Sequence, residues 1–393
     1  MTRRAVYGPL SPLRLVECRV PELPGREWVR LKTILGGVCG TDLALISLRQ
    51  HPATILQAFA RFPAGLGHEN VARIDEVGSG ATGWSKGQRV CVEPALGCQA
   101  RGVELLCRQC AAGRFSLCEL EGDDRFPPRA LIGLNAFTSG SWAEYFVAHA
   151  SQLHAVPDEV GDEAAVLLDP VSSAMHAVMR RPPRPGETVL VNGSGIIALG
   201  IIASIRSLGH DNAVTILARH EFQAELARRF GATSVLPAPR GGKASSRYDA
   251  IARHVGGRRI AGRFGNQALL GGFDLTFECT GKGAGLTDAM KWTRSRGTVV
   301  LVGTSGIALV DTTPLWFDEL EIIGANGRQI EAGNGRSQHT YDLVLEWLQT
   351  GRLDLSGIPI SRYRLADYRR AIEHLTSRNR HPVTKAAFFI DGP

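Results

Sequence analysis

The sequence predicts an α/β protein of two domains, a β-rich domain and a doubly wound parallel sheet. With 393 residues, the chain is too long for one ordinary hydrophobic core. Short β-type runs broken by Gly and Pro dominate the first 160 residues. From residue 188 onward, strand and helix patterns alternate, as they do in βαβ units.

The β-rich part contains several short runs with strand character. Residues 28–33 and 71–77 are examples, and the second run ends at a Gly-Ser-Gly turn. We expect a loop over residues 46–67, with a helix-compatible piece at 53–62. This loop could border an active site.

The pattern changes at Asp162, where apolar residues begin to recur at helical intervals. Pro170 interrupts this helical signal, which ends before the Pro-rich segment 182–186. The expected strands that follow are 188–191, 213–218, 273–277 and 298–302. The expected helices between them are 196–208, 222–230 and 285–293. The end of the chain is predicted to add helices at 340–348 and 365–375 and a closing strand at 383–390.

Composition excludes several classes of protein. The apolar fraction of 44% and the charged fraction of 21% are typical of a soluble globular protein. No stretch of 18 apolar residues occurs, so we expect no transmembrane helix and no membrane partner. The first residues include two arginines but no apolar segment behind them, so no signal peptide is expected and a cytoplasmic location follows.

The net charge of +7 allows two interpretations. The densest basic run, 240–263, is rich in Gly and Ser and carries no nucleic-acid-binding motif. We therefore interpret it as a solvated surface insertion and expect no nucleic-acid partner. The surplus charge mildly favours an anionic, phosphorylated cofactor.

A glycine-rich turn follows the first predicted strand of the parallel sheet. Gly193, Gly195 and Ala198 fit the dinucleotide fingerprint Gly-x-Gly-x-x-Gly/Ala, with Ile196 and Ile197 between them. Gly193 permits the tight turn, and Gly195 leaves room for a pyrophosphate beside the backbone. The phosphates would then lie over a helix N-terminus, where free N–H groups point at them.

The end of the second strand indicates which dinucleotide binds. NAD sites place Asp or Glu there, about 20 residues after the turn, to bond the ribose 2′-OH. This chain has Arg219 and His220 instead. Without an acid there is no repulsion of a 2′-phosphate, and Arg219 could pair with it, so NADP(H) is favoured over NAD(H). The alternative is that Arg219 is an ordinary exposed arginine.

Four of the eight cysteines lie within 21 residues: Cys98, Cys107, Cys110 and Cys118. A long chain without an export signal does not suggest disulfides. Four thiolates suit a closed, tetrahedral, structural zinc site. In the alternative interpretation, Cys98 is too distant and only three thiolates converge.

A second group of candidate metal ligands has a different composition. Cys39 and His68 supply the thiolate and imidazole that zinc prefers, and Asp169 could add a carboxylate. Three protein ligands leave one coordination position open, as in catalytic zinc sites. Asp42 is a candidate acceptor for the free ring N–H of His68. His176 is interpreted as a core histidine.

With these residues the chain resembles the zinc-dependent medium-chain dehydrogenase/reductase family, which includes alcohol, sorbitol, threonine and glucose dehydrogenases. The resemblance covers nearly the whole chain. It rests on the cysteine cluster and on the motifs at 37–42, 67–69, 87–90, 142–145, 169–170 and 278–281.

The resemblance implies a GroES-like catalytic domain over 1–170 and 323–393, with a Rossmann domain inserted over 171–322. It implies that Thr41 contacts the substrate alcohol and begins a proton relay, and that Glu69 lies beside the metal and can coordinate it. It also implies a homodimer or homotetramer. Further residues expected at the cofactor are Cys279, Thr280, Gly303 and Asn326.

The chain departs from the family pattern at three places. Six extra residues separate Cys98 from Cys107. The third catalytic ligand, usually Cys or Glu, is Asp169, so direct ligation, a water bridge or displacement of zinc toward Glu69 are all open. Ala44 occupies the position where some relatives have a relay histidine, so the relay beyond Thr41 is unassigned.

The sequence therefore predicts a zinc-dependent oxidoreductase that transfers hydride between NADP(H) and a secondary alcohol or polyol and its carbonyl. Two alternatives remain. One is a zinc-independent enone or quinone reductase, and the other is a non-catalytic NADPH-binding protein. The sequence does not identify the substrate.

Overall fold

The computed structural model describes residues 1–8, 11–49, 51, 53–238, 244–304, 306–333, 335–377 and 383–390. The chain forms two compact units. Residues 1–172 and 328–393 make up unit 1, and residues 173–327 make up unit 2. Among the described residues, no helix is long and apolar enough to cross a membrane.

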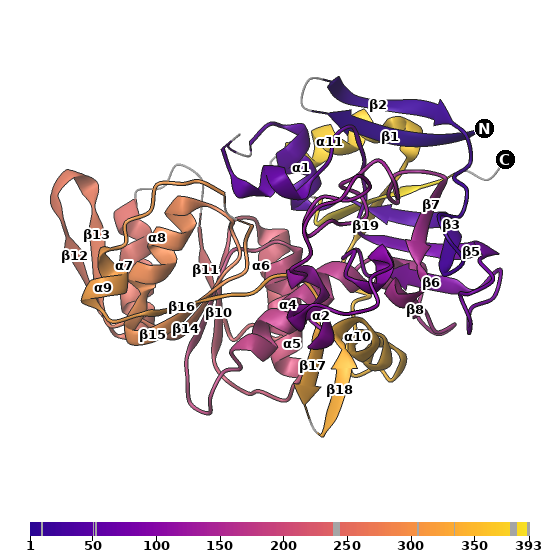
Figure 1. Ribbon diagram of the computed structural model, residues 1–393. Helices are drawn as coiled ribbons and strands as arrows, with labels where there is room; N and C mark the ends of the chain where they lie inside the picture. The colour runs from indigo at the N-terminus through magenta and orange to yellow at the C-terminus, as the bar shows by residue number, and fades with distance from the viewer. Residues whose placement is uncertain are drawn as a thin grey trace. The chain divides into compact units, whose positions relative to one another are not determined.

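Unit 1 is built on β-sheets, as the short Gly- and Pro-broken runs predict (Figure 1). A seven-stranded sheet has the order β19-β20-β3-β5-β6-β8, with β7 also paired to β3. Its strands are β3 (Trp28–Gly37), β5 (Asn70–Val77), β6 (Arg89–Val92), β7 (Tyr145–His149), β8 (Leu153–Ala155), β19 (Ile360–Arg364) and β20 (Lys385–Phe389). A three-stranded sheet contains β1 (Thr2–Gly8), β2 (Ser11–Cys18) and β4 (Ala64–Gly65).

The helices of unit 1 are short. They are α1 (Gly40–Ile46), α2 (Arg108–Ala111), α3 (Asp162–Ala165), α10 (Thr340–Gln349) and α11 (Tyr368–Thr376), with 3-10 turns η1 (Ile55–Phe59), η2 (Gln99–Arg101), η3 (Phe115–Leu117), η4 (Ala150–Gln152) and η6 (Leu365–Asp367). The expected helical piece at 53–62 is thus a single 3-10 segment. A hairpin not expected from the sequence, β17 (Ile330–Gly333) and β18 (Arg336–His339), precedes α10.

Helix α4 (Leu168–Arg180) belongs partly to each unit. Pro170 lies in its first turn, where a missing backbone N–H costs no intrahelical hydrogen bond. The expected interruption at Pro170 is therefore a helix start.

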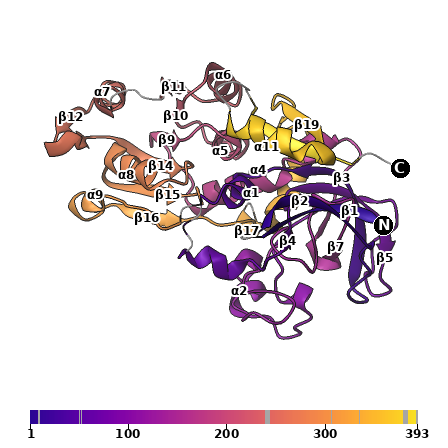
Figure 2. The ribbon, with the colours of Figure 1, turned by 90° about the horizontal axis from the view of Figure 1, so that it is seen from above.

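Unit 2 contains a six-stranded parallel sheet with the order β11-β10-β9-β14-β15-β16 (Figure 2). Its strands are β9 (Val189–Asn192), β10 (Val214–Ala218), β11 (Ser234–Pro237), β14 (Phe273–Glu278), β15 (Thr293–Leu301) and β16 (Glu321–Gly324). The helices are α5 (Ile196–Ser207), α6 (Glu221–Arg229), α7 (Ala244–Val255), α8 (Gly283–Trp292) and α9 (Thr313–Phe317). The strand order reverses between β9 and β14, which is the point where such sheets bind nucleotides.

The basic run at 240–263 contains more structure than the sequence suggested. Residues 240–243 lie outside the described residues. Helix α7 follows them, and its residues Tyr248, Ile251 and Ala252 are buried, so this part is a packed helix and not a solvated insertion. A hairpin, β12 (Arg258–Ala261) and β13 (Gln267–Leu270), then leads to β14 and forms a sheet of its own.

Trp142 helps to position the loop that carries the first candidate metal ligand. Its side chain is fully buried, its indole N–H donates to the carbonyl of Gly37 (2.9 Å), and its ring packs edge-on against Phe388. Gly67, directly before His68, has φ +95, and a Cβ there would lie 2.4 Å from the Trp142 ring. Only glycine fits this turn beside the Trp142 ring. The segments that carry Cys39 and His68 therefore both pack against Trp142.

Candidate catalytic and nucleotide sites

Cys39, His68 and Glu69 converge in unit 1. One ligand atom from each lies within 4.8 Å of the others. Cys39 follows β3 and caps the N-terminus of α1, and His68 and Glu69 precede β5. His68 and Glu69 are buried, and Cys39 is half-buried. Thiolate, imidazole and carboxylate together form a donor set that suits zinc.

Asp42 contacts two members of this group. Its carboxylate accepts the backbone N–H of Cys39 (2.9 Å), and its Oδ1 lies 3.6 Å from Nδ1 of His68. Burial lowers the pKa of His68, but the charges of Asp42 and Cys39 outweigh burial and raise it well above its ordinary value. Oδ1 of Asp42 and Nδ1 of His68 are buried without a hydrogen-bond partner among the described residues. Asp42 therefore occupies the place expected of a carboxylate that orients a ligand histidine.

Glu69 forms an ion pair with Lys385 in β20, and both side chains are almost fully buried. Burial raises the pKa of Glu69, and Asp169 adds to this, whereas Lys385 and His68 oppose it. The lysine thus compensates for a carboxylate that would otherwise be costly to bury.

Asp169 has different partners. The hydroxyl of Tyr341 donates to its Oδ1 (2.9 Å), and Nε of Arg328 lies 3.3 Å from the same oxygen. Arg328 also pairs with Glu93 (3.2 Å). Asp169 is not among the described residues whose ligand atoms come within 4.8 Å of Cys39 and His68. It lies near enough to Glu69 to affect the pKa of that residue.

The remaining catalytic candidate, Thr41, lies in the first turn of α1. Its hydroxyl is 3.7 Å from the sulfur of Cys39, and the residue is half-buried. His176, interpreted as a core residue, is 1% exposed.

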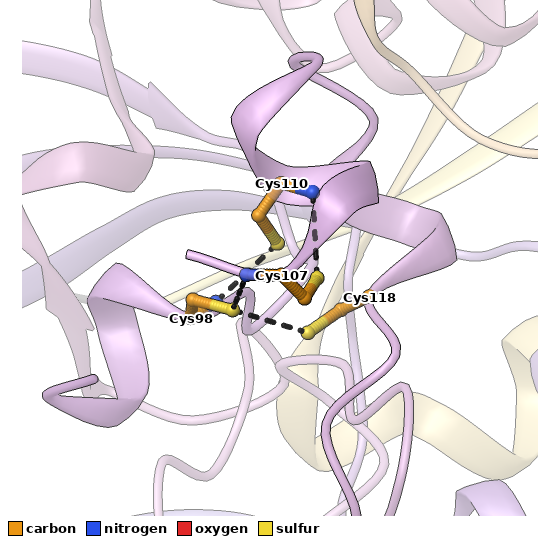
Figure 3. Close-up of side chains that lie close together, drawn as sticks. All are labelled: Cys98, Cys107, Cys110 and Cys118. Atoms are coloured by element: carbon orange, nitrogen blue, oxygen red, sulfur yellow. Dashed lines mark hydrogen bonds between the residues drawn. The ribbon is translucent and has the colours of Figure 1, made fainter. Parts of the chain in front are cut away.

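A second cluster contains four cysteines, Cys98, Cys107, Cys110 and Cys118 (Figure 3). Their four sulfur atoms all lie within 4.8 Å of one another. Cys107 caps α2, and Cys118 follows η3. Backbone N–H groups point at the sulfur atoms, as at Cys107 N to Cys98 Sγ (3.3 Å) and Glu119 N to Cys107 Sγ (3.4 Å). The residues between Cys98 and Cys107 form η2 and the loop that follows it, so the longer spacing still lets the two sulfur atoms meet.

Without a metal the four thiols differ in acidity, because the pKa values of Cys107 and Cys118 are lowered and those of Cys98 and Cys110 are raised. A hydrogen bond from Cys110 lowers the pKa of Cys118 to about 5. The donor set therefore fits a structural zinc ion.

The nucleotide turn lies between β9 and α5 in unit 2. Gly193 has φ +130, and its missing Cβ would lie 3.2 Å from the Cβ of Cys279. Gly195 caps α5, and no atom of the described residues other than its chain neighbours lies within 4 Å of the place where its Cβ would be. Ile196 and Ile197 form the first helical positions, and Ala198 is buried. This open helix N-terminus fits a pyrophosphate.

The other cofactor candidates follow the carboxyl ends of neighbouring strands. Arg219 is exposed, and His220 caps α6, both directly after β10. Cys279 and Thr280 follow β14, where the buried Glu278 accepts the backbone N–H of Thr280 (2.7 Å). Gly303 follows β15 and donates to the carbonyl of Glu278 (2.8 Å), and Asn326 follows β16. The parallel sheet thus brings these residues to one edge.

Sequence reasoning missed the partners of the two carboxylates at the first site, which are Lys385, Arg328 and Tyr341, and it missed Glu93, the second partner of Arg328. A signal existed for Lys385, because it is the one charged residue in the apolar run 383–390. Nothing in the local sequence of Arg328 or Tyr341 marked either residue.

Two family models match this chain. Residues 25–158 match the alcohol dehydrogenase GroES-like domain, and residues 197–350 match the zinc-binding dehydrogenase domain. The L-threonine 3-dehydrogenase of Anaeromyxobacter sp. (strain K) is 28% identical over 359 residues, which are 91% of this chain and 90% of that protein.

Two solved structures share the fold. A protein of Sinorhizobium meliloti 1021, classed as a zinc-binding dehydrogenase and bound to NADP, has a TM-score of 0.73 at 22% identity, over 99% of both chains. Acetophenone reductase from Geotrichum candidum NBRC 4597, in complex with NAD, also has a TM-score of 0.73, at 21% identity over 99% of this chain and 97% of that one. The converging ligands, the parallel sheet and the two domain matches lead to one conclusion: the chain belongs to the zinc-type medium-chain dehydrogenase family.

Proposed function

We propose that this chain is a zinc-dependent oxidoreductase that transfers hydride between NADP(H) and a secondary alcohol or polyol and its carbonyl. The convergence of Cys39, His68 and Glu69 carries the proposal. When bound, zinc supplies a Lewis acid for the substrate oxygen, and the nicotinamide supplies or accepts the hydride. The protein provides the ligands, the orientation and the path of the proton.

Cys39, His68 and Glu69 would hold the catalytic zinc. Asp169 is the weaker candidate, because Tyr341 and Arg328 already occupy its Oδ1. We assign Asp169 a positioning role beside the metal ligands. Glu69 could exchange between Lys385 and a bound metal ion, because its buried carboxylate pairs with Lys385 and also lies within 4.8 Å of the ligand atoms of Cys39 and His68.

Thr41 would receive the substrate proton. It lies in the turn that carries Cys39, so its hydroxyl is held close to the metal ligand. Asp42 fixes that turn through the N–H of Cys39 and faces the ring of His68. We therefore assign proton transfer to Thr41 and the orientation of the His68 ring to Asp42.

NADP(H) is the proposed cofactor. Similar structures hold NADP in one case and NAD in another, so the fold does not decide between them. The preference rests on the turn after β10, where Arg219 and His220 stand in place of an acid. An exposed arginine there can pair with a 2′-phosphate.

The four-cysteine cluster is proposed to hold a second, structural zinc ion. Its four cysteines, Cys98, Cys107, Cys110 and Cys118, would fill all four coordination positions of a tetrahedral zinc ion, so no position would remain for a substrate. Its contribution would be to the stability of the lobe that contains α2 and η3.

The test is a panel of alcohols, polyols and ketones with NADP(H), combined with zinc analysis by mass spectrometry. We expect two zinc ions per chain and turnover that is lost with the catalytic zinc. Turnover of enones that survives full chelation would favour the zinc-independent reductase. Tight NADPH binding without turnover of any substrate would favour the non-catalytic binder.

A further inference from the structure

Unit 1 contains a cavity that has no part in the proposed reaction. The cavity has a volume of about 170 Å³, and its walls come from the segment 93–115, from η4 and β8, and from the hairpin of β17 and β18. All of these segments belong to unit 1. None of the candidate catalytic residues lines the cavity, so it is separate from the proposed catalytic zinc site.

The lining of the cavity includes both exposed and buried residues. Gln99 and Ser151 are exposed, and Ile330 is 40% exposed, so a small molecule can enter from solvent. Glu93 and His339 are only 3% and 7% exposed. One water molecule takes about 30 Å³ of the liquid, so the cavity has room for a small organic molecule.

His339 presents a hydrogen-bond donor to this cavity. It caps α10, and its Nδ1 accepts the backbone N–H of Tyr341 (3.1 Å). Burial, with help from His154 and Arg328, holds the pKa of His339 well below its ordinary value, so the ring is neutral and carries one proton. Because Nδ1 is an acceptor, that proton is on Nε2. Nε2 is buried and has no hydrogen-bond partner among the described residues, so the position suits a ligand that accepts.

Glu93 presents the complementary acceptor. One of its carboxylate oxygens, Oε2, accepts the backbone N–H of Ala95 (3.1 Å). The other, Oε1, forms an ion pair with Arg328 (3.2 Å) but accepts no hydrogen bond from a described residue. Arg328 therefore balances the charge of the carboxylate, and Oε1 can still accept from a ligand.

These two groups select the class of ligand. A hydroxyl can both accept and donate, so two neighbouring hydroxyls can bond Nε2 of His339 and Oε1 of Glu93 at once. An anion would face the carboxylate of Glu93, and a cation would gain little because Arg328 already balances that charge. Leu106 and Phe115 supply apolar walls for the carbon atoms of the ligand.

We propose that this cavity binds a small, uncharged alcohol with two neighbouring hydroxyl groups. The ligand accepts a hydrogen bond from Nε2 of His339 and donates one to Oε1 of Glu93. The cavity is thus a second small-molecule site of unit 1, apart from the candidate catalytic residues. This inference does not rest on the proposed function.

The experiment uses the zinc-loaded full chain at pH 7.5, with propane-1,2-diol as the probe and saturation-transfer NMR as the measurement. We expect saturable binding in the millimolar range. Leu106→Trp narrows the cavity and should raise the Kd about tenfold or more. Leu105→Trp, at a neighbour that is 87% exposed and does not line the cavity, should leave the Kd unchanged.

Two further measurements test the polar contacts. His339→Asn keeps an acceptor for the backbone N–H of Tyr341 but removes Nε2, so it should raise the Kd by about 3–10-fold. Lactate has the carbon skeleton of the diol and a negative charge, so the wild type should bind it about tenfold more weakly or worse.

The catalytic zinc site could also bind the probe, and Cys39→Ser separates the two sites. Binding that persists in Cys39→Ser and weakens in Leu106→Trp supports the inference. Absence of binding by the wild type, binding that neither Leu106→Trp nor His339→Asn weakens, or equal binding of lactate would overturn it. If a variant does not fold, a crystal of the wild type soaked in the diol provides a second measurement. Diol density in contact with His339 and Glu93 supports the inference, and a cavity without diol refutes it.

Discussion

Lys385 and Glu69 form an ion pair in the interior of unit 1, with side chains 2% and 1% exposed. They are 316 residues apart in the sequence. Glu69 also belongs to the candidate metal group, so the lysine and a bound zinc ion would compete for one carboxylate. This relationship links the stability of unit 1 to the chemistry of its site.

Lys385→Met should destabilise the protein by about 3–5 kcal/mol, because it leaves a buried carboxylate without its cation. Urea unfolding of the metal-free protein measures this change. Lys86→Met, at a lysine that is 77% exposed, is the matched control and should change stability by less than about 0.5 kcal/mol. Equal effects of the two substitutions would show that the buried pair contributes little.

The two carboxylates near the metal group should differ in zinc retention. Glu69→Gln should lower the affinity for catalytic zinc by about 10–100-fold or more, because it removes a proposed ligand. Asp169→Asn should have a smaller effect, since Asp169 acts through Tyr341 and Arg328. Competition with a chromogenic chelator measures both affinities. The reverse order would make Asp169 the ligand.

Cys98→Ser should remove one zinc ion per chain and lower the melting temperature, because Cys98 contributes one of four clustered sulfur atoms. Metal analysis and calorimetry check the two effects. Cys18→Ser, at a cysteine outside both clusters, should change neither. An unchanged zinc content in Cys98→Ser would mean that only three thiolates bind.

Arg219→Ala should weaken NADPH binding by about 10–100-fold, the loss expected for a charge-assisted contact to phosphate of about 1.5–3 kcal/mol. NADH has no 2′-phosphate, so its affinity should be unchanged. Fluorescence titration of both nucleotides measures the difference. Arg228→Ala, at an exposed arginine of the adjacent helix α6, is the control. Equal affinity of the wild type for the two nucleotides would refute the NADP preference.

His339 should make the protein less stable in mild acid. Burial, with help from His154 and Arg328, holds the pKa of His339 well below its ordinary value of 6.5. The unfolded chain therefore binds a proton below pH 6.5 that the folded protein does not, and stability falls by about 1.4 kcal/mol per pH unit as the pH decreases. This contribution is fully present above pH 6.5.

His339→Asn should remove that fall, because asparagine does not titrate and can still accept the backbone N–H of Tyr341. Urea unfolding at pH 7.5, 6.5 and 5.5 compares the variant with the wild type. His51→Asn, at an exposed histidine, should leave the pH dependence as it is in the wild type. A His339→Asn variant with the same slope as the wild type would contradict the assignment.

Much of the parallel sheet could be predicted because its elements alternate and have strong local signals. The expected strand at 213–218 is observed as Val214–Ala218, and the expected helix at 196–208 as Ile196–Ser207. Predictions for the run 240–263 were poorer. Its composition is that of a surface insertion, whereas α7 is held by the burial of Tyr248 and Ile251. Burial of this kind depends on neighbours that lie far away in the sequence.

Residue type and short-range spacing were sufficient to single out Cys39, His68 and the four clustered cysteines. Thiolate and imidazole ligands are chemically distinctive, and each lies in a short motif of its own. The partners of the two carboxylates could be decided only by the folded chain, which brings Lys385 to Glu69, and Arg328 and Tyr341 to Asp169. Their sequence separations are large, and a buried charge takes whichever opposite charge the topology places beside it.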